Sequence, residues 1–304
     1  MQSVVGLGSV ASEIVQPVLG AAIKYIENPN ALDLAQASGA IVRASFIFNN
    51  EVFAKMPNLK VIARTGVGTE LVDLDIADQK KIPVVITPGS NTVAVAEGTF
   101  AHLLALSKRI KPLTNLVANG KWSERTNYPV GDLEGLTLGL IGYGRIGKKV
   151  GEFASAFGMD LKVYDPFIEV PEKLKTSLDE IFATSDYLSL HIPLTADNEK
   201  LINSATFSKM KPGVMIINCS RGALIDLDAA LIALESGQLG GLGLDVFDPE
   251  PPIHHRIFDH ENVLLTPHVM GLSKQSTIAT FIDAATGVRD VLEGRVPKAV
   301  ANLK

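Results

Sequence analysis

The chain has 304 residues, 46% of them hydrophobic, and a formal net charge of -5 at pH 7. This length predicts two domains with sizeable cores, and the mild negative charge argues against binding to nucleic acid or to an anionic membrane. The sequence opens without a cationic leader, and no uninterrupted apolar run reaches the roughly 18 residues of a membrane span. Its single cysteine, Cys219, excludes an intrachain disulfide. We therefore expect a cytoplasmic protein with a small-molecule partner.

Short β-rich apolar runs alternate with helical patterns along the whole chain. The strands predicted in the first third are Val4–Leu7, Ala40–Arg43, Val61–Arg64 and Pro83–Ile86. Those predicted from the middle onward are Leu136–Ile141, Leu161–Tyr164, Tyr187–His191, Val214–Asn218, Gly243–Val246 and Val263–Thr266. Such alternation indicates βαβ units and parallel sheets, and the number of strands predicts two α/β domains.

The first strand is followed by Gly6-Leu7-Gly8-Ser9-Val10-Ala11, which fits a glycine-rich dinucleotide pattern. However, Pro17 interrupts the helix that follows, and the next strand, Lys24–Ile26, is short. We therefore interpret this segment as an ordinary βα turn.

The segment Thr92–Leu116 is strongly apolar up to its lysines. Its pattern predicts one long helix, placed where the second domain begins.

The most informative segment is Thr137–Gly147, in which an apolar strand leads into a glycine-rich turn and a helical pattern begins inside the turn. Gly142 is expected to allow the tight turn, Gly144 the close approach of a pyrophosphate, and Gly147 the packing of the helix against the strand. The phosphates would then lie at the positive end of the helix.

The next strand ends at Asp165, the position from which an acid accepts both hydroxyls of an adenine ribose. Pro166 and Phe167 follow, without a nearby Arg or Lys. A 2′-phosphate would face this carboxylate without a counter-charge, so the segment predicts NAD rather than NADP.

Three ionisable residues, Arg221, Glu250 and His268, each follow a predicted strand, where ligands of open α/β sheets bind. A guanidinium can hold a carboxylate through two hydrogen bonds, and an imidazole oriented by a carboxylate can move a proton near pH 7. Each residue alone has an ordinary explanation as a surface or turn residue. Together, beside a dinucleotide turn, they predict an oxidoreductase site.

The other histidines are not expected to bind a metal. His254, His255 and His260 lie in a charged loop without a third spaced ligand, and His102 lies in the apolar helix, where we expect it to be packed. We predict no metal.

These segments resemble the D-isomer-specific 2-hydroxyacid dehydrogenases over nearly the whole chain. The matching blocks are Arg64–Gly68, Asn91–Glu97, Gly142–Gly147, His191–Thr195, Asn218–Gly222, Leu244–Phe247 with Glu250 and Pro251, and Thr266–His268. The resemblance implies two doubly wound parallel-sheet domains. A NAD-binding Rossmann domain, residues 93–278, is inserted into a flavodoxin-like substrate domain, residues 1–92 and 279–304.

The resemblance also implies catalytic roles. His268 would exchange a proton with the substrate oxygen, Glu250 would hold that imidazole, and Arg221 would anchor a 2-oxo acid. The backbone around Val67 and Gly68 would take the substrate carboxylate.

Further residues are implied at the cofactor, with Asp245 near the nicotinamide carboxamide and Cys219 as a packing residue rather than a nucleophile. The implied cofactor-binding residues are Gly142, Gly144, Arg145, Ile146, Gly147, Asp165, Ile192, Pro193, Cys219 and Asp245.

Within the family the chain is most similar to short phosphoglycerate dehydrogenases, through the blocks Ile41–Ser45, Lys121–Arg125 and Val296–Asn302. In that group the arginines matching Arg43 and Arg125 lie near the substrate, the second reaching across a dimer. The resemblance thus implies a homodimer and favours D-3-phosphoglycerate. The chain ends where the catalytic core of that group ends, so we expect no regulatory domain.

Three alternatives stay open. Met270 stands where the family usually has small residues and could reshape the pocket, so the substrate could be glyoxylate, hydroxypyruvate or another D-2-hydroxy acid. An NAD-sensing binding protein, like the C-terminal-binding-protein corepressors, is a second alternative. Formate dehydrogenases share the fold but carry an amide in place of Glu250, so the carboxylate favours reduction of a 2-oxo acid.

Overall fold

The computed structural model describes residues 1–43 and 45–303. The chain divides into two compact units: unit 1 is Met1–Asn91 with Leu272–Lys304, and unit 2 is Thr92–Gly271. Ala44 of the Ile41–Ser45 block and Lys304 at the end of the predicted substrate domain lie outside the described residues. The first predicted boundary, after residue 92, falls one residue beyond the observed one. The second, after residue 278, falls inside helix α11 (Lys274–Leu292), which packs as one piece in unit 1.

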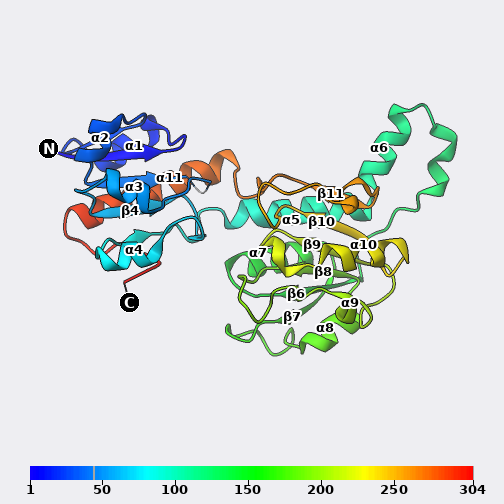
Figure 1. Cartoon of the computed structure of the whole chain (residues 1–304). Coiled ribbons are helices and arrows are strands. Elements are labelled where there is room, and N and C mark those ends of the chain that lie inside the picture. The colour runs from blue at the N-terminus through cyan, green and yellow to red at the C-terminus, as the bar shows by residue number, and fades with distance from the viewer. Residues whose placement is uncertain (44, 304) are drawn as a thin grey trace. The chain divides into compact units, whose positions relative to one another are not determined.

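Unit 1 is built on a five-stranded sheet in the order β2-β1-β3-β4-β5, with all pairs parallel. Figure 1 labels strand β4 of this sheet and the helices of the unit. This is the strand order of flavodoxin-like folds. Helix α11 packs against α1, and its residues Phe281 and Val288 are buried in one hydrophobic cluster of the unit. A second cluster contains Phe48 and residues of α3. The strands are β1 (Gln2–Leu7), β2 (Ile23–Ile26), β3 (Gly39–Val42), β4 (Val61–Arg64) and β5 (Val84–Val85). The helices besides α11 are α1 (Ser12–Leu19), α2 (Ala31–Gln36), α3 (Asn50–Lys55) and α4 (Leu74–Gln79).

Unit 2 contains a six-stranded parallel sheet in the order β11-β10-β9-β8-β6-β7. Lys175 forms a single parallel bridge with Val163 of β7, where dinucleotide-binding sheets carry their third strand. The strands are β6 (Thr137–Ile141), β7 (Asp160–Tyr164), β8 (Tyr187–Leu190), β9 (Val214–Asn218), β10 (Leu239–Leu244) and β11 (Val263–Leu265). The helices are α5 (Thr92–Ser107), α6 (Ile110–Ala118), α7 (Arg145–Ala156), α8 (Leu178–Thr184), α9 (Ser204–Phe207) and α10 (Leu227–Glu235), with short 3₁₀ turns at η1 (Trp122–Asn127), η2 (Gly222–Leu224) and η3 (Arg256–Asp259). The predicted fold class, two doubly wound parallel-sheet α/β domains, is confirmed.

The single long helix predicted over Thr92–Leu116 is wrong, because the chain forms two helices there. Arg109 between them has a left-handed backbone (φ 52°). In a continuous helix, Pro112 would lie in the interior, where its ring clashes with the carbonyl of the preceding turn and no N–H is available. The break places Pro112 in the first turn of α6, where an N–H has no helical partner in any case.

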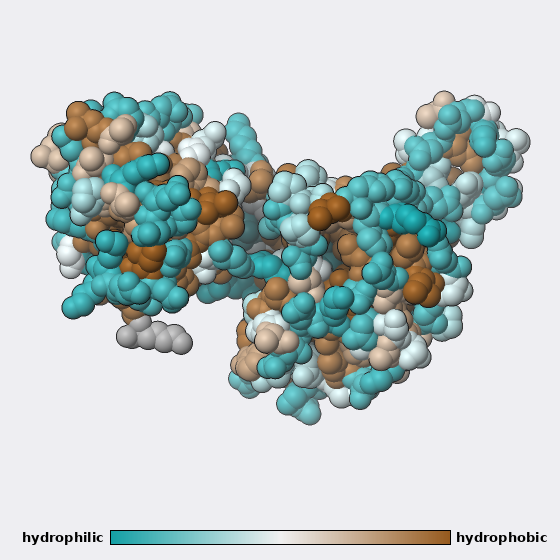
Figure 2. All heavy atoms as spheres, viewed as in Figure 1, coloured by the Kyte–Doolittle hydropathy of each residue, from teal (hydrophilic) through white to brown (hydrophobic). Residues whose placement is uncertain are grey.

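In the view of Figure 2, hydrophilic residues cover most of each unit, and hydrophobic residues form separate patches. Among the residues that the structure describes, no helix combines the length and the apolar character that a membrane crossing needs.

Candidate active site

The glycine-rich turn after β6 has the geometry expected for a dinucleotide site. Gly142 has φ +100°, and a Cβ there would collide with the carbonyl oxygen of His191. A Cβ on Gly147 would collide with the carbonyl oxygen of Gly142. At Gly144 the nearest atom to such a Cβ, Cδ1 of Ile168, is 4.0 Å away. The chain itself therefore requires Gly142 and Gly147, whereas Gly144 leaves space for a ligand.

The end of β7 lies against this turn. Asp165 Oδ2 accepts a hydrogen bond from the backbone N–H of Tyr143, at 2.7 Å. Its Oδ1 accepts from the N–H groups of Phe167 and Ile168, at 2.9 and 3.0 Å. Because a carboxylate oxygen accepts more than one hydrogen bond, Asp165 can still receive ribose hydroxyls. Arg145 and Ile146 begin α7 beside it, after Gly144 as the N-cap.

The glycine-rich turn of unit 1 is filled by the chain's own side chains. Glu27 Oε2 accepts from the backbone N–H of Ser12 at the start of α1, at 3.1 Å. The Tyr25 hydroxyl donates to the carbonyl of Val10, at 2.8 Å, and occupies the space beside Gly6. This geometry agrees with an ordinary βα turn.

The turn that follows β8 lies close to the glycine-rich turn of unit 2. Ile192 abuts Gly142, and Pro193 follows it. Burial raises the pKa of the Cys219 thiol to about 12, so the thiol stays protonated at neutral pH and suits packing rather than nucleophilic attack.

His191, for which the sequence suggested no role, is partly buried directly below the glycine-rich turn. Its Nε2 lies 2.8 Å from the hydroxyl of Ser189. Burial lowers the pKa of His191 to about 4, so the imidazole is neutral near pH 7.

The structure brings His268 and Glu250 together. His268 Nδ1 lies 2.8 Å from Glu250 Oε2, and Glu250 Oε1 accepts from the backbone N–H of Phe247 at 3.0 Å. A carboxylate only accepts hydrogen bonds, so Nδ1 carries the proton and Nε2 is left for exchange with a substrate. The His268 side chain is 54% exposed, which leaves it accessible to a substrate.

Arg221 is held in a turn next to this pair. The buried Asn218 donates from Nδ2 to the Arg221 carbonyl, at 2.7 Å, and its Oδ1 accepts from the N–H of Ser220, at 3.0 Å. A Cβ on Gly222 would collide with the backbone of Phe247. Glycine thus lets the Arg221 turn approach the loop that carries Glu250.

Asp245 lies beneath the His268 turn and is 2% exposed. Its Oδ1 accepts from the Thr266 hydroxyl and from the N–H of Val269, at 2.6 and 2.9 Å, and its Oδ2 accepts from the N–H of Met270 at 3.1 Å. The family resemblance implies that Asp245 contacts the nicotinamide carboxamide, and it gives no sign that this carboxylate supports the turn after His268.

In unit 1 the predicted carboxylate-binding loop is supported by a buried arginine. Arg64, 2% exposed, donates from Nε to the Gly68 carbonyl at 3.1 Å and from Nη1 to the Arg43 carbonyl at 2.8 Å. Val67 at the tip of this loop is exposed.

The two arginines predicted to bind phosphate have ring partners. The Arg43 guanidinium lies 5.5 Å from the centre of the Phe281 ring, and burial lowers its pKa. The Arg125 guanidinium lies 5.3 Å from the Trp122 ring and donates to the Trp122 carbonyl at 3.2 Å. Arg125 is on η1, in an arm with α6 that projects from the sheet of unit 2 (Figure 1). Among the described residues, the hydrogen bond and the ring contact of Arg125 both involve Trp122 rather than Glu250 or His268.

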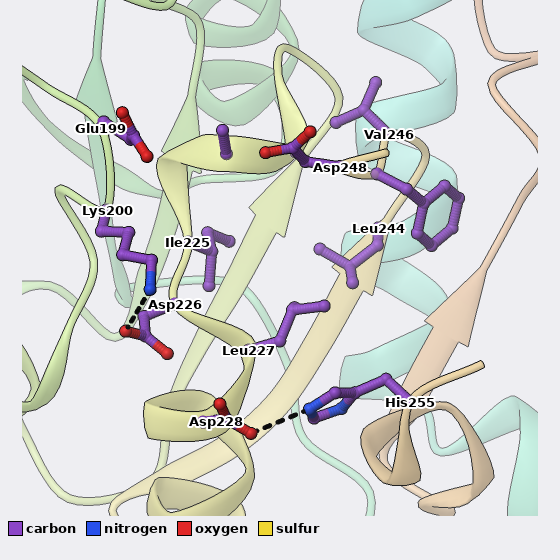
Figure 3. A pocket seen from close by; sticks show the side chains of 13 residues that line it. Glu199, Lys200, Ile225, Asp226, Leu227, Asp228, Leu244, Val246, Asp248 and His255 are labelled. Carbon is purple, nitrogen blue, oxygen red and sulfur yellow. Dashed lines mark hydrogen bonds and ion pairs between the residues drawn. The ribbon is translucent and has the colours of Figure 1, made fainter. Parts of the chain in front are cut away.

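A pocket of about 180 Å³ is lined by Gly222 and Phe247, but not by Arg221, Glu250 or His268. Figure 3 shows that its basic side chains face acids: Lys200 points to Asp226 and His255 to Asp228, at 3.1 Å in each pair.

Comparison with known proteins identifies the family. The model described as D-isomer specific 2-hydroxyacid dehydrogenase, NAD binding domain, matches residues 100–270. The chain belongs to the D-isomer specific 2-hydroxyacid dehydrogenase family. The matched domain binds NAD in this family, which confirms the cofactor prediction.

Relatives and solved structures agree with this family. The D-3-phosphoglycerate dehydrogenase of Bacillus subtilis (strain 168) is 33% identical over 303 residues, which are 97% of this chain and 58% of that protein. The enzyme of the same name from Synechocystis is 35% identical over 98% of this chain and 55% of its own length. The chain thus spans little more than half the length of these relatives. The structure of D-lactate dehydrogenase from Aquifex aeolicus, complexed with NAD and lactic acid, has a TM-score of 0.81 and 31% identity, over 96% of each chain.

Proposed function

We propose that the chain catalyses the reversible, NAD-dependent oxidation of a D-2-hydroxy acid to a 2-oxo acid, with D-3-phosphoglycerate as the substrate. The observation that carries the proposal is the 2.8 Å contact of His268 Nδ1 with Glu250 Oε2, in the unit that carries the dinucleotide turn. NAD, bound at Gly144 and Asp165, supplies the nicotinamide that accepts the hydride.

The residues of unit 2 account for the rest of the reaction. In the oxidation, His268 Nε2 removes the hydroxyl proton, and in the reduction it returns that proton to the carbonyl oxygen. Glu250 fixes the ring orientation and stabilises the imidazolium that forms. The guanidinium of Arg221 binds the 2-oxo acid and faces the developing negative charge on oxygen.

The phosphorylated substrate is supported by the two curated relatives and by Arg43, whose half-buried guanidinium would interact strongly with a phosphate. One charge-assisted hydrogen bond contributes about 1.5–3 kcal/mol, so even a single contact predicts at least a tenfold advantage for the phosphorylated acid. An unphosphorylated D-2-hydroxy acid is the second candidate, favoured by the likeness to a D-lactate dehydrogenase structure.

A panel of 2-oxo acids, scored by NADH oxidation, tests both candidates. We expect kcat/KM for 3-phosphohydroxypyruvate to exceed that for hydroxypyruvate, glyoxylate and pyruvate by tenfold or more. Arg43→Ala and Arg125→Ala should each reduce this ratio. Arg295→Ala, which removes an exposed arginine paired with Asp290, is the matched control and should leave it unchanged. A larger kcat/KM for an unphosphorylated acid would refute the phosphoglycerate assignment and leave the dehydrogenase assignment standing.

An NAD-sensing binding protein remains the alternative of a different class. Such a protein would bind NADH but would not oxidise it at a useful rate with any acid of the panel. Tight NADH binding without turnover would therefore favour that alternative.

We also propose that the chain forms a homodimer and acts in the cytoplasm. The arm of α6 and η1 exposes Ile110, Val117 and Trp122, apolar side chains that a second copy could cover. Light scattering should give twice the chain mass, and Val117→Glu, on the exposed face of α6, should shift the mass toward that of the monomer. A monomeric parent protein would refute the dimer proposal.

A further inference from the structure

A row of polar contacts runs inside unit 2 behind the catalytic histidine. His102, in α5, is 3% exposed, and its Nε2 lies 3.0 Å from the hydroxyl of Thr266, just after β11. The same hydroxyl lies 2.6 Å from Asp245 Oδ1, at the end of β10. The three side chains thus link helix α5 to the carboxyl end of the sheet.

The chemistry of the groups fixes the direction of these hydrogen bonds. A carboxylate can only accept, so the Thr266 hydroxyl donates its single proton to Asp245. The hydroxyl must then accept from His102, whose Nε2 therefore carries the proton. His102 Nδ1 is left unprotonated, and it is buried without a hydrogen-bond partner in the described residues. Burial also lowers the pKa of His102, in keeping with a neutral ring.

The Asp245 carboxylate also accepts hydrogen bonds from the turn that follows the catalytic histidine. It accepts from the N–H groups of Val269 and Met270, the two residues directly after His268. His268 itself has φ 52°, a left-handed conformation that residues with a side chain rarely adopt. Such a conformation persists where surrounding contacts hold it.

Two glycines make room for this arrangement. A Cβ on Gly98, one helical turn before His102, would collide with the side chain of Met270, which therefore packs against α5. A Cβ on Gly243, in β10, would lie 2.8 Å from His102 Nδ1. The helix thus holds the loop after His268 at two points, through Met270 directly and through His102 by way of Thr266 and Asp245.

We propose that His102 and Thr266 are positioning residues that act through Asp245 to hold the left-handed turn of His268 and so aim its imidazole at the substrate. The proposal rests on the proposed function, in which His268 exchanges the substrate proton. Small displacements of a catalytic group are costly, since a shift of about 1 Å can reduce a rate by about a hundredfold.

The pair Thr266→Val and Thr266→Ser provides the main test. Valine keeps the shape but removes the hydroxyl, while serine keeps the hydroxyl. For Thr266→Val we expect at least a tenfold lower kcat, an NADH dissociation constant within threefold of the parent, and at least tenfold faster amide hydrogen exchange at Val269 and Met270. Thr266→Ser should recover most of the kcat and the slow exchange.

Variants at His102 give an independent test that leaves the contact between Thr266 and Asp245 in place. His102→Gln retains an N–H donor that can reach Thr266, whereas His102→Leu has none. We expect faster amide exchange at Val269 and Met270 in the leucine variant and near-parent exchange in the glutamine variant. If Thr266→Val does not fold, this pair of variants tests the proposal.

Two results would overturn the proposal: parent-like kcat and amide exchange in both Thr266→Val and His102→Leu, or a serine variant as impaired as the valine variant. A parent protein that turns over no 2-oxo acid would refute the proposed function instead. In that case the exchange measurements still show whether His102 and Thr266 hold the turn.

Discussion

Substitutions of three glycines by alanine within one short segment should separate cofactor binding from folding. At Gly144 a methyl group has space, with its nearest neighbour 4.0 Å away, and the backbone (φ -69°, ψ -163°) is open to any residue. At Gly147 the methyl group would collide with the carbonyl oxygen of Gly142, a backbone atom that cannot rotate away. At Gly151, in the same helix, the nearest atom is a leucine methyl at 3.4 Å, an ordinary contact.

The expected magnitudes differ accordingly. Gly144→Ala should change the free energy of unfolding by no more than about 1 kcal/mol, the scale of a helix N-cap substitution. The methyl group would, however, take the space of the pyrophosphate. Losing one charge-assisted hydrogen bond costs about 1.5–3 kcal/mol, so the dissociation constant of NADH should rise at least tenfold. Gly147→Ala should lower the free energy of unfolding by about 1–3 kcal/mol, the usual cost of overpacking.

NADH fluorescence titration and urea unfolding of each variant measure the two quantities. Gly151→Ala is the control and should keep both parent-like binding and at least parent-like stability, since alanine favours a helix over glycine. The reasoning is refuted if Gly144→Ala binds NADH as tightly as the parent, or if Gly147→Ala is as stable as Gly151→Ala.

The remaining predictions concern three ionisable side chains. The kcat/KM of the parent protein should be at least tenfold higher with NAD than with NADP. Asp165→Ala should raise KM for NAD and reduce that ratio. Equal kcat/KM with both cofactors in the parent would contradict the role of Asp165. In steady-state kinetics, His268→Ala should lower kcat about a hundredfold or more. His254→Ala, which removes an exposed imidazole, is the control and should not lower kcat in this way. The pKa of His191 is about 6.5 in the unfolded state and about 4 in the native state. Between these values the unfolded state binds a proton that the native state does not, so the free energy of unfolding falls as the pH drops from about 6.5 to 4. Between pH 7.5 and 5 the parent should lose about 2 kcal/mol more than His191→Gln in urea unfolding, and equal losses would show that His191 is not buried as a neutral ring.

Strand positions and glycine spacing are the features that sequence patterns express most directly. The turn Gly142–Gly147 and Asp165 are separated by a single βα unit, so their proximity follows from local connectivity. The proximity of Glu250 and His268 follows almost as directly, because β10 and β11 are neighbours and the carboxyl ends of parallel strands meet at one edge.

The features that sequence reasoning missed depend on the balance between competing local signals. Pro112 alone disfavours a continuous helix, but the apolar pattern around it predicts one. The left-handed residue that ends the first helix, Arg109, carries no sequence signal of its own. The second domain boundary has a local sequence signal at Ser273. Ser273 caps α11, with its Oγ accepting from the N–H of Ser276 at 3.1 Å, and a serine before a helical pattern marks a helix start.

The support of the catalytic turn could not be predicted for a different reason. His102 lies in a helix far along the chain from Thr266 and Asp245, and a pattern of apolar residues assigns it only to a buried face. Its polar role appears only once the helix is packed, because Gly243 opens the space that its ring occupies. A buried polar group without a partner is costly, so burial of this histidine requires an acceptor such as the Thr266 hydroxyl. The hydrogen bond from His102 to Thr266 also connects the packing of α5 to the turn at His268, because Thr266 and that turn both bind Asp245. The family resemblance assigns Asp245 only to the cofactor.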